Sequence, residues 1–239
     1  MALTCYDKYV NSKEIQSRLA HAVNYNNWLF SQVEKYTGNR ILEVGCALGN
    51  FTKKIINREF ICAIDMEKGY IEAIKDYFKG KDSFKAVKCD ISLPEALLLK
   101  DNRFDTILCF NVLEHIKNDD VALRHMYQLL ESRGFLCLIV PAFQSIFGEM
   151  DKTDNHCLRY NKKVLLEKVQ AAGFQVSDVK YINAIGFLSW WFNGKILRRR
   201  YIPFRQMLFY DKIIPLVGIL ERIVNLPFGQ SLVLIANKR

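Results

Sequence analysis

Apolar runs of strand length alternate with longer, helix-like patterns of apolar positions from residue 40 to about residue 182. The short apolar runs predict buried strands at residues 40–44, 60–64, 84–88, 104–110 and 134–140. Apolar positions at helical spacing, the last set followed by Gly173 as a C-cap, predict helices at residues 50–57, 68–78, 119–131 and 161–171. This alternation is typical of an α/β fold, in which helices cover both faces of a mostly parallel sheet.

The pattern changes after Gly173. Residues 174–182 predict a sixth strand, and residues 230–237, with the sequence QSLVLIAN, predict a seventh. Residues 184–228 lie between these strands as an aromatic and basic insertion without a simple period. Residues 1–37 are predicted to form a helical cover over the ligand site. No repeat or linker divides the chain, so we expect one domain over residues 1–239.

Composition predicts a globular protein in a reducing compartment. Half of the 239 residues are hydrophobic, which is enough for a sizeable core. The first residues carry acids where a signal peptide needs an apolar stretch, and no run approaches the roughly 18 apolar residues of a membrane span. The seven cysteines include no C-x-x-C pair and predict free thiols. We therefore expect a cytoplasmic protein.

A turn rich in small residues follows the first predicted strand, with the spacing Gly45-x-Ala47-x-Gly49. A dinucleotide site needs G-x-G-x-x-G, whose second and third glycines are missing here. Packing alone also explains small residues in such a turn. Asp65 ends the second strand and Asp90 follows the third, on the side where open α/β sheets bind ligands. Each acid alone is also explained as a helix cap or a solvated loop residue.

The order of the segments EVGCALG, AIDMEKG, KCDIS, FDTILCFNVLEHI and GFLCLIVPA resembles the class I S-adenosylmethionine-dependent methyltransferases. The resemblance covers roughly residues 38–182 and the terminal strand. It implies a seven-stranded Rossmann-like sheet with an antiparallel last strand. It also implies that Glu43 orients the loop and the methionine end of S-adenosylmethionine, that Gly45 and Gly49 allow its close approach, and that Asn111 lies near the sulfonium.

At the adenosine end the resemblance implies that Asp65 binds the ribose, Met66 packs beside the adenine and Asp90 contacts the base. Ala47 departs from the commonest glycine and is interpreted as a tolerated variant. The set implied to bind the cofactor and its product S-adenosylhomocysteine is completed by Cys46, Ala47 and Ile91.

Two histidines are candidates for the acceptor side. His115 lies in the loop after the fourth strand, where the pair Glu114-His115 contacts cofactor or substrate in one interpretation and caps a local helix in the other. Related quinone methyltransferases bind a divalent metal through E-x-x-E-H, but Asn111 replaces the first acid here. No metal is therefore predicted.

His156, Arg159 and Tyr160 follow the fifth strand in DNHCLRY, after a loop that could act as a lid. An imidazole can take a proton from a hydroxyl, and a guanidinium can hold a carboxylate or phosphate. Similar H-x-x-R-Y sequences occur in methyltransferases found with glycan-assembly enzymes. The alternative is that these three residues tie the lid to Asp151 or Asp154.

The net charge of +9 is concentrated in residues 184–228, where seven basic residues against two acids supply five of the charges. We rank a substrate lid or dimer surface first, a membrane-proximal surface for a lipid-linked substrate second, and nucleic-acid binding third. The chain lacks both an N-P-P-F/Y sequence after the fourth strand and a recognisable RNA-binding module, which makes a nucleic-acid partner the weakest of these.

We therefore predict a methyltransferase that acts on a hydroxyl of a small molecule or sugar, including a lipid-linked or nucleotide-linked glycan intermediate. An N-methyltransferase and a nucleic-acid methyltransferase are alternatives. From other classes, a nicotinamide-dependent oxidoreductase and a catalytically silent cofactor-binding scaffold remain, although the glycine spacing argues against the former. A homodimer and peripheral membrane contact through residues 184–228 are the expected partnerships beyond the acceptor.

Overall fold

A computed structural model describes residues 17–224 and 226–239 of the chain. The first part of the helical cover predicted for residues 1–37 therefore lies outside the described residues, as does residue 225 of the insertion. The remainder of the cover contains the helix α2 (Val23–Ser31) and the short 3₁₀ helix η1 (Glu34–Tyr36). Trp28 and Leu29 of α2 pack on one face of the sheet.

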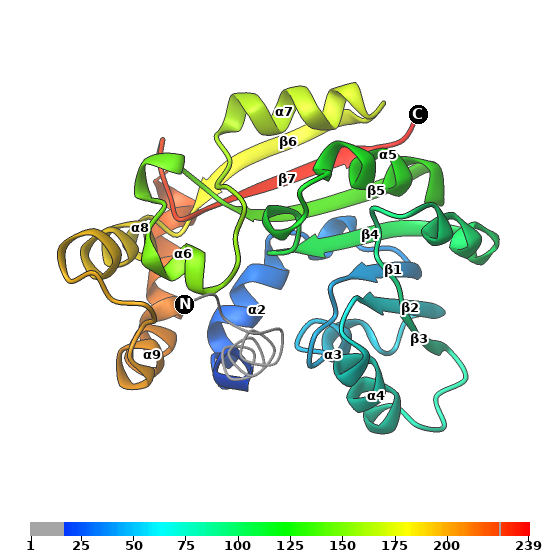
Figure 1. Ribbon diagram of the computed structural model, residues 1–239, viewed down its shortest axis with the longest axis horizontal. Helices are drawn as coiled ribbons and strands as arrows, with labels where there is room; N and C mark the ends of the chain where they lie inside the picture. The colour runs from blue at the N-terminus through cyan, green and yellow to red at the C-terminus, as the bar shows by residue number, and fades with distance from the viewer. Residues whose placement is uncertain (1–16, 225) are drawn as a thin grey trace, which may run out of the picture.

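Seven strands form one sheet in the order β3-β2-β1-β4-β5-β7-β6 (Figure 1). Neighbouring strands from β3 to β5 pair in parallel, and β7 runs antiparallel to both of its neighbours. The strands are β1 (Arg40–Val44), β2 (Phe60–Asp65), β3 (Phe84–Lys88), β4 (Phe104–Phe110), β5 (Leu130–Pro141), β6 (Gln175–Ile182) and β7 (Ser231–Asn237). The predicted fold class is thus confirmed.

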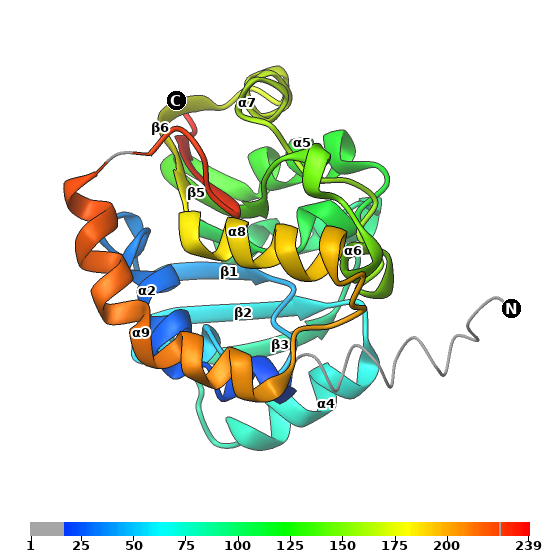
Figure 2. The same cartoon turned by 90° about the vertical axis from the view of Figure 1, so that its left-hand side faces the viewer.

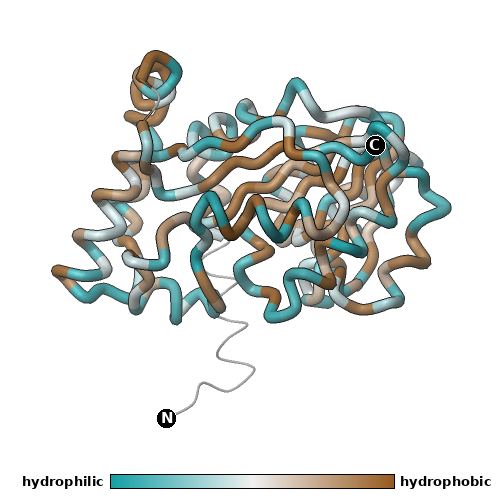
Figure 3. Tube along the Cα trace, turned by 90° about the horizontal axis from the view of Figure 1, so that it is seen from above, coloured by the Kyte–Doolittle hydropathy of each residue, from teal (hydrophilic) through white to brown (hydrophobic). Residues whose placement is uncertain are grey.

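Helices cover both faces of this sheet because strand residues alternate between the two faces. Leu42 and Val44 of β1 join the core under α5 (Asp119–Leu129) and α7 (Lys162–Ala171). Ile41 faces the opposite core, under α2, α3 (Thr52–Ile55) and α9 (Phe204–Ile223). On the same side α4 (Lys68–Tyr77) covers β2 and β3. Hydrophobic residues accordingly gather along the central strands (Figure 3).

The structure departs from the predicted elements mainly where long-range pairing extends them. β5 begins at Leu130 instead of residue 134, because Leu130 pairs with Phe104 of β4. The predicted helix 50–57 is limited to Thr52–Ile55. The segment between β5 and α7 contains the short helices η4 (Gln144–Ile146) and α6 (Glu149–Thr153).

The insertion folds as α8 (Ala184–Trp191), a π-helical turn η5 (Phe192–Ile196) and the long helix α9. Apolar residues lie on several sides of α9, which explains why no simple helical period marks it in the sequence. Across the described residues, the helices lack the combination of length and hydropathy that a membrane span requires.

Candidate functional site

The predicted cofactor residues meet at the carboxyl ends of the central strands. Val44 of β1 pairs with Ile64 of β2 and with Cys109 of β4, and Asp65 pairs with Lys88 of β3. Since these strands are parallel and in register, the residues that follow them lie along one edge of the sheet. We call this edge, made of residues 43–49, Asp65, Asp90 and Asn111, the cofactor edge.

The turn after β1 requires left-handed backbone at three positions. Gly45 has φ +77° and Gly49 has φ +75°. A Cβ atom on Gly45 would lie 2.2 Å from Cγ2 of Val112, so only glycine fits there. Ala47 also has a positive φ, of 44°, in the region that glycine adopts at least cost. The observed conformation therefore gives a physical reason why glycine is the commoner residue at position 47.

Glu43 lies buried beneath this turn, and its carboxylate accepts a hydrogen bond from the hydroxyl of Thr52. Burial raises the pKa of Glu43 to about 8, although the hydrogen bonds from Thr52 oppose the shift. A buried carboxyl of this kind ionises readily when a cation is placed beside it. The residue thus fits the amino group of an amino-acid ligand.

Asp65 is held in place at the end of β2 by backbone donors. Its Oδ2 accepts the N–H of Ala47 at 2.9 Å, and its Oδ1 accepts the N–H of Glu67 at 2.9 Å. Burial raises the pKa of Asp65, while these backbone hydrogen bonds act in the opposite direction. The carboxylate is consequently oriented before any ligand arrives, and its remaining lone pairs are available to accept ribose hydroxyls.

The other predicted cofactor residues differ in what they offer at this edge. Met66 is 57% exposed beside Asp65, whereas the side chains of Cys46 and Ile91 are buried in the core, so a ligand could meet only their backbone. Oδ1 of Asp90 accepts hydrogen bonds from the backbone N–H and hydroxyl of Ser92, at 2.8 and 2.7 Å.

Asn111 is the first residue after β4 and has a φ of 52°. Its side chain is exposed at the carboxyl end of the sheet. Its backbone N–H donates to the carbonyl of Ile139 at 2.7 Å.

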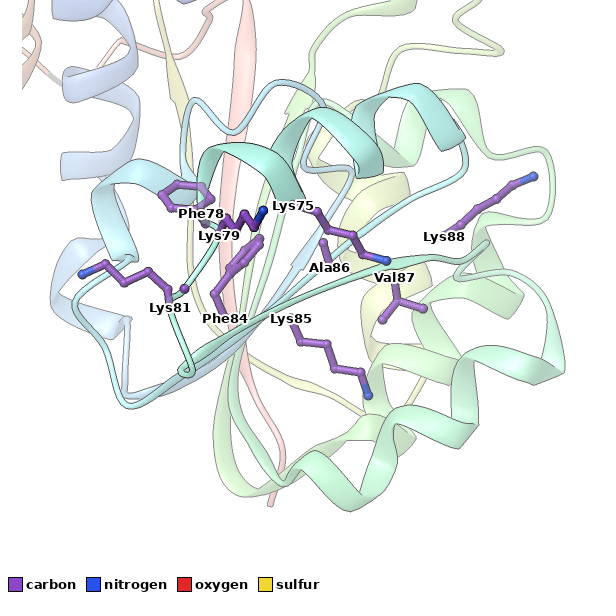
Figure 4. A pocket seen from close by; sticks show the side chains of 10 residues that line it. Lys75, Phe78, Lys79, Lys81, Phe84, Lys85, Ala86, Val87 and Lys88 are labelled. Atoms are coloured by element: carbon purple, nitrogen blue, oxygen red, sulfur yellow. The ribbon is translucent and has the colours of Figure 1, made fainter.

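A separate hollow of about 490 Å³ lies between α4 and β3 (Figure 4). Five lysines and the rings of Phe78 and Phe84 line it, and no predicted site residue does. It therefore belongs to the outer edge of the sheet and not to the cofactor edge.

On the acceptor side, a buried carboxylate organises the residues that follow β5. Asp151 is fully buried; its Oδ1 accepts from Nδ1 of His156 at 2.9 Å and from Nε of Arg159 at 2.7 Å. Its Oδ2 accepts the N–H of Gly148 at 2.9 Å and lies 3.4 Å from the indole nitrogen of Trp190 in α8. We call Glu114, Asp151, Asp154, His156 and Arg159 the Asp151 cluster.

His156 is held at both ring nitrogens within this cluster. Nε2 lies 3.2 Å from Oδ2 of Asp154 and 3.9 Å from Oε1 of Glu114. Burial disfavours the charged imidazolium, but hydrogen bonds to Asp151 and Asp154 and the charge of Glu114 outweigh it and raise the pKa of His156 to about 10. In the absence of an acceptor, His156 is therefore positively charged at neutral pH.

Glu114 and His115 approach the Asp151 cluster from the loop after β4. Glu114 is completely buried, and neither of its carboxylate oxygens has a hydrogen-bond partner among the described residues. Burial raises its pKa, opposed by the charges of His115 and His156. The rings of His115 and His156 meet edge to face with centroids 4.8 Å apart. A buried carboxylate that accepts no hydrogen bond is costly, and the charges of His115 and of His156, with Nε2 3.9 Å from Oε1, offset part of that cost.

The same residues bear on the question of a metal. Glu114, His115 and His156 each place one ligand atom within 4.8 Å of the others. Two cations already lie in this cluster, since His156 pairs with Asp151 and Asp154 and Arg159 pairs with Asp151. The prediction of no metal stays untested.

Arg159 has the position expected of the structural alternative, whereas Tyr160 has a different partner. Arg159 is buried, pairs with Asp151, donates to the carbonyl of Ala142 at 3.1 Å and stacks over Trp190. The hydroxyl of Tyr160 is also buried and donates to Oδ2 of Asp119 in α5 at 2.7 Å. Neither side chain is free to meet an acceptor, but only Arg159 ties the lid to Asp151.

The sequence named Asp151 only as an alternative anchor, considered Glu114 only together with His115, and gave no reason to select Trp190. Asp151 lies five residues before His156 and eight before Arg159, but such a spacing of charged residues is common in loops. The burial of Glu114 and the contact of Trp190 with Arg159 depend on three separate segments. No local signal predicts this burial or this contact.

Comparison with known proteins gives one match to a family model. Residues 42–136 match the model described as a methyltransferase domain. The chain is 28% identical over 140 residues to the non-reducing polyketide synthase Preu3 of Preussia isomera, a match that covers 52% of this chain and 6% of the synthase. It is 26% identical over 144 residues to the malonyl-[acyl-carrier protein] O-methyltransferase of Calditerrivibrio nitroreducens, covering 59% of this chain and 50% of the relative. The chain thus spans half or less of these relatives.

Two solved structures illustrate the fold. The [4+2]-cyclase SpnF aligns with a TM-score of 0.59 at 19% identity, over 90% of this chain and 81% of the cyclase. The N-methyltransferase NodS of Bradyrhizobium japonicum, solved with S-adenosyl-L-homocysteine, aligns with a TM-score of 0.54 at 13% identity, over 89% and 84% of the two chains. At such identities the alignments establish the fold alone. The reaction has to be argued from the site.

Proposed function

The chain carries a class I S-adenosylmethionine-dependent methyltransferase domain, and from this premise we propose that it methylates a hydroxyl group of a small-molecule or sugar acceptor. The observation that supports the proposal most is the alignment of Gly45, Asp65 and Asn111 at one edge of the sheet, within electrostatic reach of His115, whose ring meets that of His156 in the Asp151 cluster. Donor and acceptor residues therefore share one site.

We assign the residues of the cofactor edge to parts of S-adenosylmethionine. Gly45 and Gly49 would allow the backbone to approach the ligand, and the buried Glu43 would accept a hydrogen bond from its amino group. The preoriented Asp65 would receive the ribose hydroxyls, and we assign Asp90 to the adenine amino group. When bound, the cofactor supplies a methyl group already activated on sulfonium.

On the acceptor side we assign His156 the role of proton acceptor, with Asp151 holding its Nδ1. As the hydroxyl oxygen forms a bond to the methyl carbon, the bond from that carbon to sulfur breaks and the hydroxyl proton moves to Nε2. Because Nε2 now faces Asp154, the acceptor must displace Asp154 to reach it. A pKa of about 10 also means that His156 must lose its proton before it can accept one.

The choice of a hydroxyl over an amine rests on two observations. The site offers carboxylates and a histidine as proton acceptors, and one relative is named an O-methyltransferase. The name describes that relative, and for this chain we propose only the same transfer of a methyl group to oxygen. A lipid-linked or nucleotide-linked glycan intermediate is our proposed acceptor class. We also place the enzyme in the cytoplasm, in keeping with the six free cysteines among the described residues.

The cofactor assignment is tested by calorimetry with S-adenosylmethionine. Asp65→Ala removes a carboxylate that is expected to make charge-assisted hydrogen bonds, so binding should weaken by roughly 10- to 100-fold. Asp82→Ala, an exposed acid in the turn before β3, is the matched control and should bind normally. Wild-type affinity for Asp65→Ala would overturn the assignment.

Methyl transfer itself is tested with labelled S-adenosylmethionine and cell extract, followed by purified acceptor fractions. His156→Ala should lose turnover by about 100-fold or more while it still binds the cofactor. The pH profile separates two roles. If His156 accepts the proton, the rate of the wild type rises with pH toward about 10; if it acts as a fixed cation, the rate falls there. Unchanged turnover by His156→Ala would return this residue to a structural role.

A further inference from the structure

An exposed apolar and basic surface covers the helices α8 and α9 and the turn between them. Of 19 large hydrophobic side chains that are exposed in the described residues, 14 lie between Ile185 and Val224 and only five elsewhere. The two helices lie on the same side of the molecule in both views (Figures 1 and 2). A concentration of exposed apolar side chains of this kind marks an interaction site.

The inner sides of both helices are firmly packed, so this exposure is not a sign of a loose segment. Gly218 of α9 packs so tightly on α2 that an added Cβ would lie 2.7 Å from Cδ1 of Trp28. Trp190 of α8 stacks under Arg159 of the Asp151 cluster. The fold thus holds a packed platform, and among the described residues its exposed aromatic rings meet His21 at Phe204 and Arg18 at Tyr201.

The charge on this platform is almost entirely positive. All seven basic residues of the segment are exposed, namely Lys195, Arg198, Arg199, Arg200, Arg205, Lys212 and Arg222. Its two acids are turned inward. Asp211 accepts the N–H of Tyr25 at 2.8 Å, and Glu221 accepts those of Asn183 and Ala184 at 2.9 and 2.8 Å. The outer surface therefore combines apolar side chains with uncompensated cations.

We propose that this platform, residues 184–224, docks on the surface of an anionic lipid bilayer. Apolar side chains can enter the boundary between headgroups and acyl chains while lysines and arginines contact the anionic headgroups. Trp191, Phe192 and Tyr201 lie near the turn between the helices, and aromatic rings of this kind favour the headgroup level.

The residue types on the platform favour a bilayer over two other occupants, a second copy of this chain and a single-stranded nucleic acid. A second copy of this chain, related by a two-fold axis, would bring the same arginines toward each other, and interface cores are poor in charge. A single-stranded nucleic acid would use the cations and aromatic rings, but not the nine aliphatic side chains among the 14 exposed hydrophobic ones. Only a lipid surface uses both kinds of residue.

Docking on a bilayer would also determine where the acceptor is met, a consequence that rests on the proposed function. In Figure 1 the arrowheads of β1 and β4 point toward the side on which α6 and α8 lie. Trp190 of α8 also contacts Asp151 directly. A platform held on the bilayer would therefore keep the Asp151 cluster near the membrane, where a lipid-linked acceptor presents its hydroxyl.

The test is flotation of the full chain with vesicles of phosphatidylcholine, with and without phosphatidylglycerol, at low and high salt. We expect at least about tenfold stronger partition into the anionic vesicles, lost at high salt. The charge variant Arg198→Glu/Arg200→Glu and the apolar variant Phe209→Ser/Ile223→Ser should each reduce partition about tenfold or more.

Matched controls lie outside the platform. Lys79→Glu/Lys81→Glu changes the same charge beside the hollow at β3, and Leu98→Ser removes a side chain that is 81% exposed, compared with 67% for Phe209 and 76% for Ile223. Both controls should float like the wild type. Calorimetry with S-adenosylhomocysteine on every variant checks the fold and keeps this inference separate from the proposed function, because vesicle binding requires no methyl transfer.

Three results would overturn the inference. One is the absence of flotation together with a dimer in sedimentation that the apolar variant dissociates. A second is tight binding of single-stranded DNA that the charge variant abolishes, again without flotation. The third is flotation of both platform variants at the level of the wild type.

Discussion

The cofactor edge and the Asp151 cluster lie side by side but are held together in different ways. At the cofactor edge, backbone conformation determines which residues fit, as the positive φ angles of Gly45 and Gly49 show. In the Asp151 cluster, buried side chains satisfy one another, with Asp151 accepting from both His156 and Arg159. The first kind of organisation rests on the backbone at the strand ends, and the second on ion pairs between buried side chains.

The largest effect expected from this difference is on Asp151. Asp151→Ala leaves the charges of His156 and Arg159 buried without their shared partner and should lower the free energy of unfolding by about 3–5 kcal/mol. Urea denaturation measures the loss. Glu149→Ala is the matched control, because it removes only an exposed ion pair with Lys152 and should leave the unfolding midpoint nearly unchanged.

We also expect the loss of stability in Asp151→Ala to leave the cofactor edge unaffected. The folded fraction of Asp151→Ala should bind S-adenosylhomocysteine within about threefold of the wild type, since no residue of the cofactor edge contacts Asp151 among the described hydrogen bonds. A loss of cofactor affinity as large as that expected for Asp65→Ala would show that the two regions are one cooperative unit.

The next effect is at Gly45. Gly45→Ala adds both the cost of a left-handed alanine and a clash with Val112, together about 2–4 kcal/mol, and it should abolish tight cofactor binding. Gly80→Ala has the same kind of backbone, with φ 82°, but no atom within 4 Å of the added Cβ. It should cost only about 1 kcal/mol and leave binding intact. Equal losses in thermal unfolding would mean that the contact with Val112 is unimportant.

Stability should depend on pH in different ranges for the two regions. Glu43 and His156 both have a pKa raised above the ordinary value, to about 8 and about 10, so each binds its proton more tightly in the folded state. The folded state therefore loses stability as pH rises, between about 4.5 and 8 for Glu43 and between about 6.5 and 10 for His156, by roughly 1–3 kcal/mol each.

Chemical denaturation across these ranges separates the two groups. Glu43→Gln should flatten the dependence below about pH 6.5, where only Glu43 contributes, and His156→Gln should flatten it above about pH 8, where only His156 contributes. If either substitution changed both ranges equally, the two groups would titrate as one coupled system and the division between the regions would fail.

The sequence predicted the fold more fully than the acceptor side. All seven strands were expected close to their observed positions, and β1, β3 and β4 at the same bounds, because buried parallel strands read as continuous apolar runs. The residues of the cofactor edge were expected as a set because each stands at a strand end. Their roles stay predictions, as do those of His115 and His156.

The remaining features depend on contacts that no sequence window contains. The sequence leaves Glu114 as either a ligand contact or a local helix cap, and does not predict its burial beside His156, 42 residues later. Helix α9 could not be predicted from the spacing of its apolar residues, because these lie on both its packed and its exposed sides. A surface that carries apolar residues outward for a partner has no helical period to detect.

The smallest predicted effect is that of Ala47→Gly at the cofactor edge. Ala47→Gly relieves the left-handed alanine at φ 44° but also increases the entropy of the unfolded chain, so the net gain in the free energy of unfolding should be about 0.5–1 kcal/mol. Arg103→Gly, at an exposed position with φ 53°, is the matched control and should give a similar gain in thermal unfolding. Neither should change cofactor affinity more than about threefold, since the N–H of residue 47 that orients Asp65 is retained. A tenfold loss in Ala47→Gly alone would instead reveal a direct contact between the Ala47 methyl group and the cofactor, which would make side-chain packing part of the edge as well.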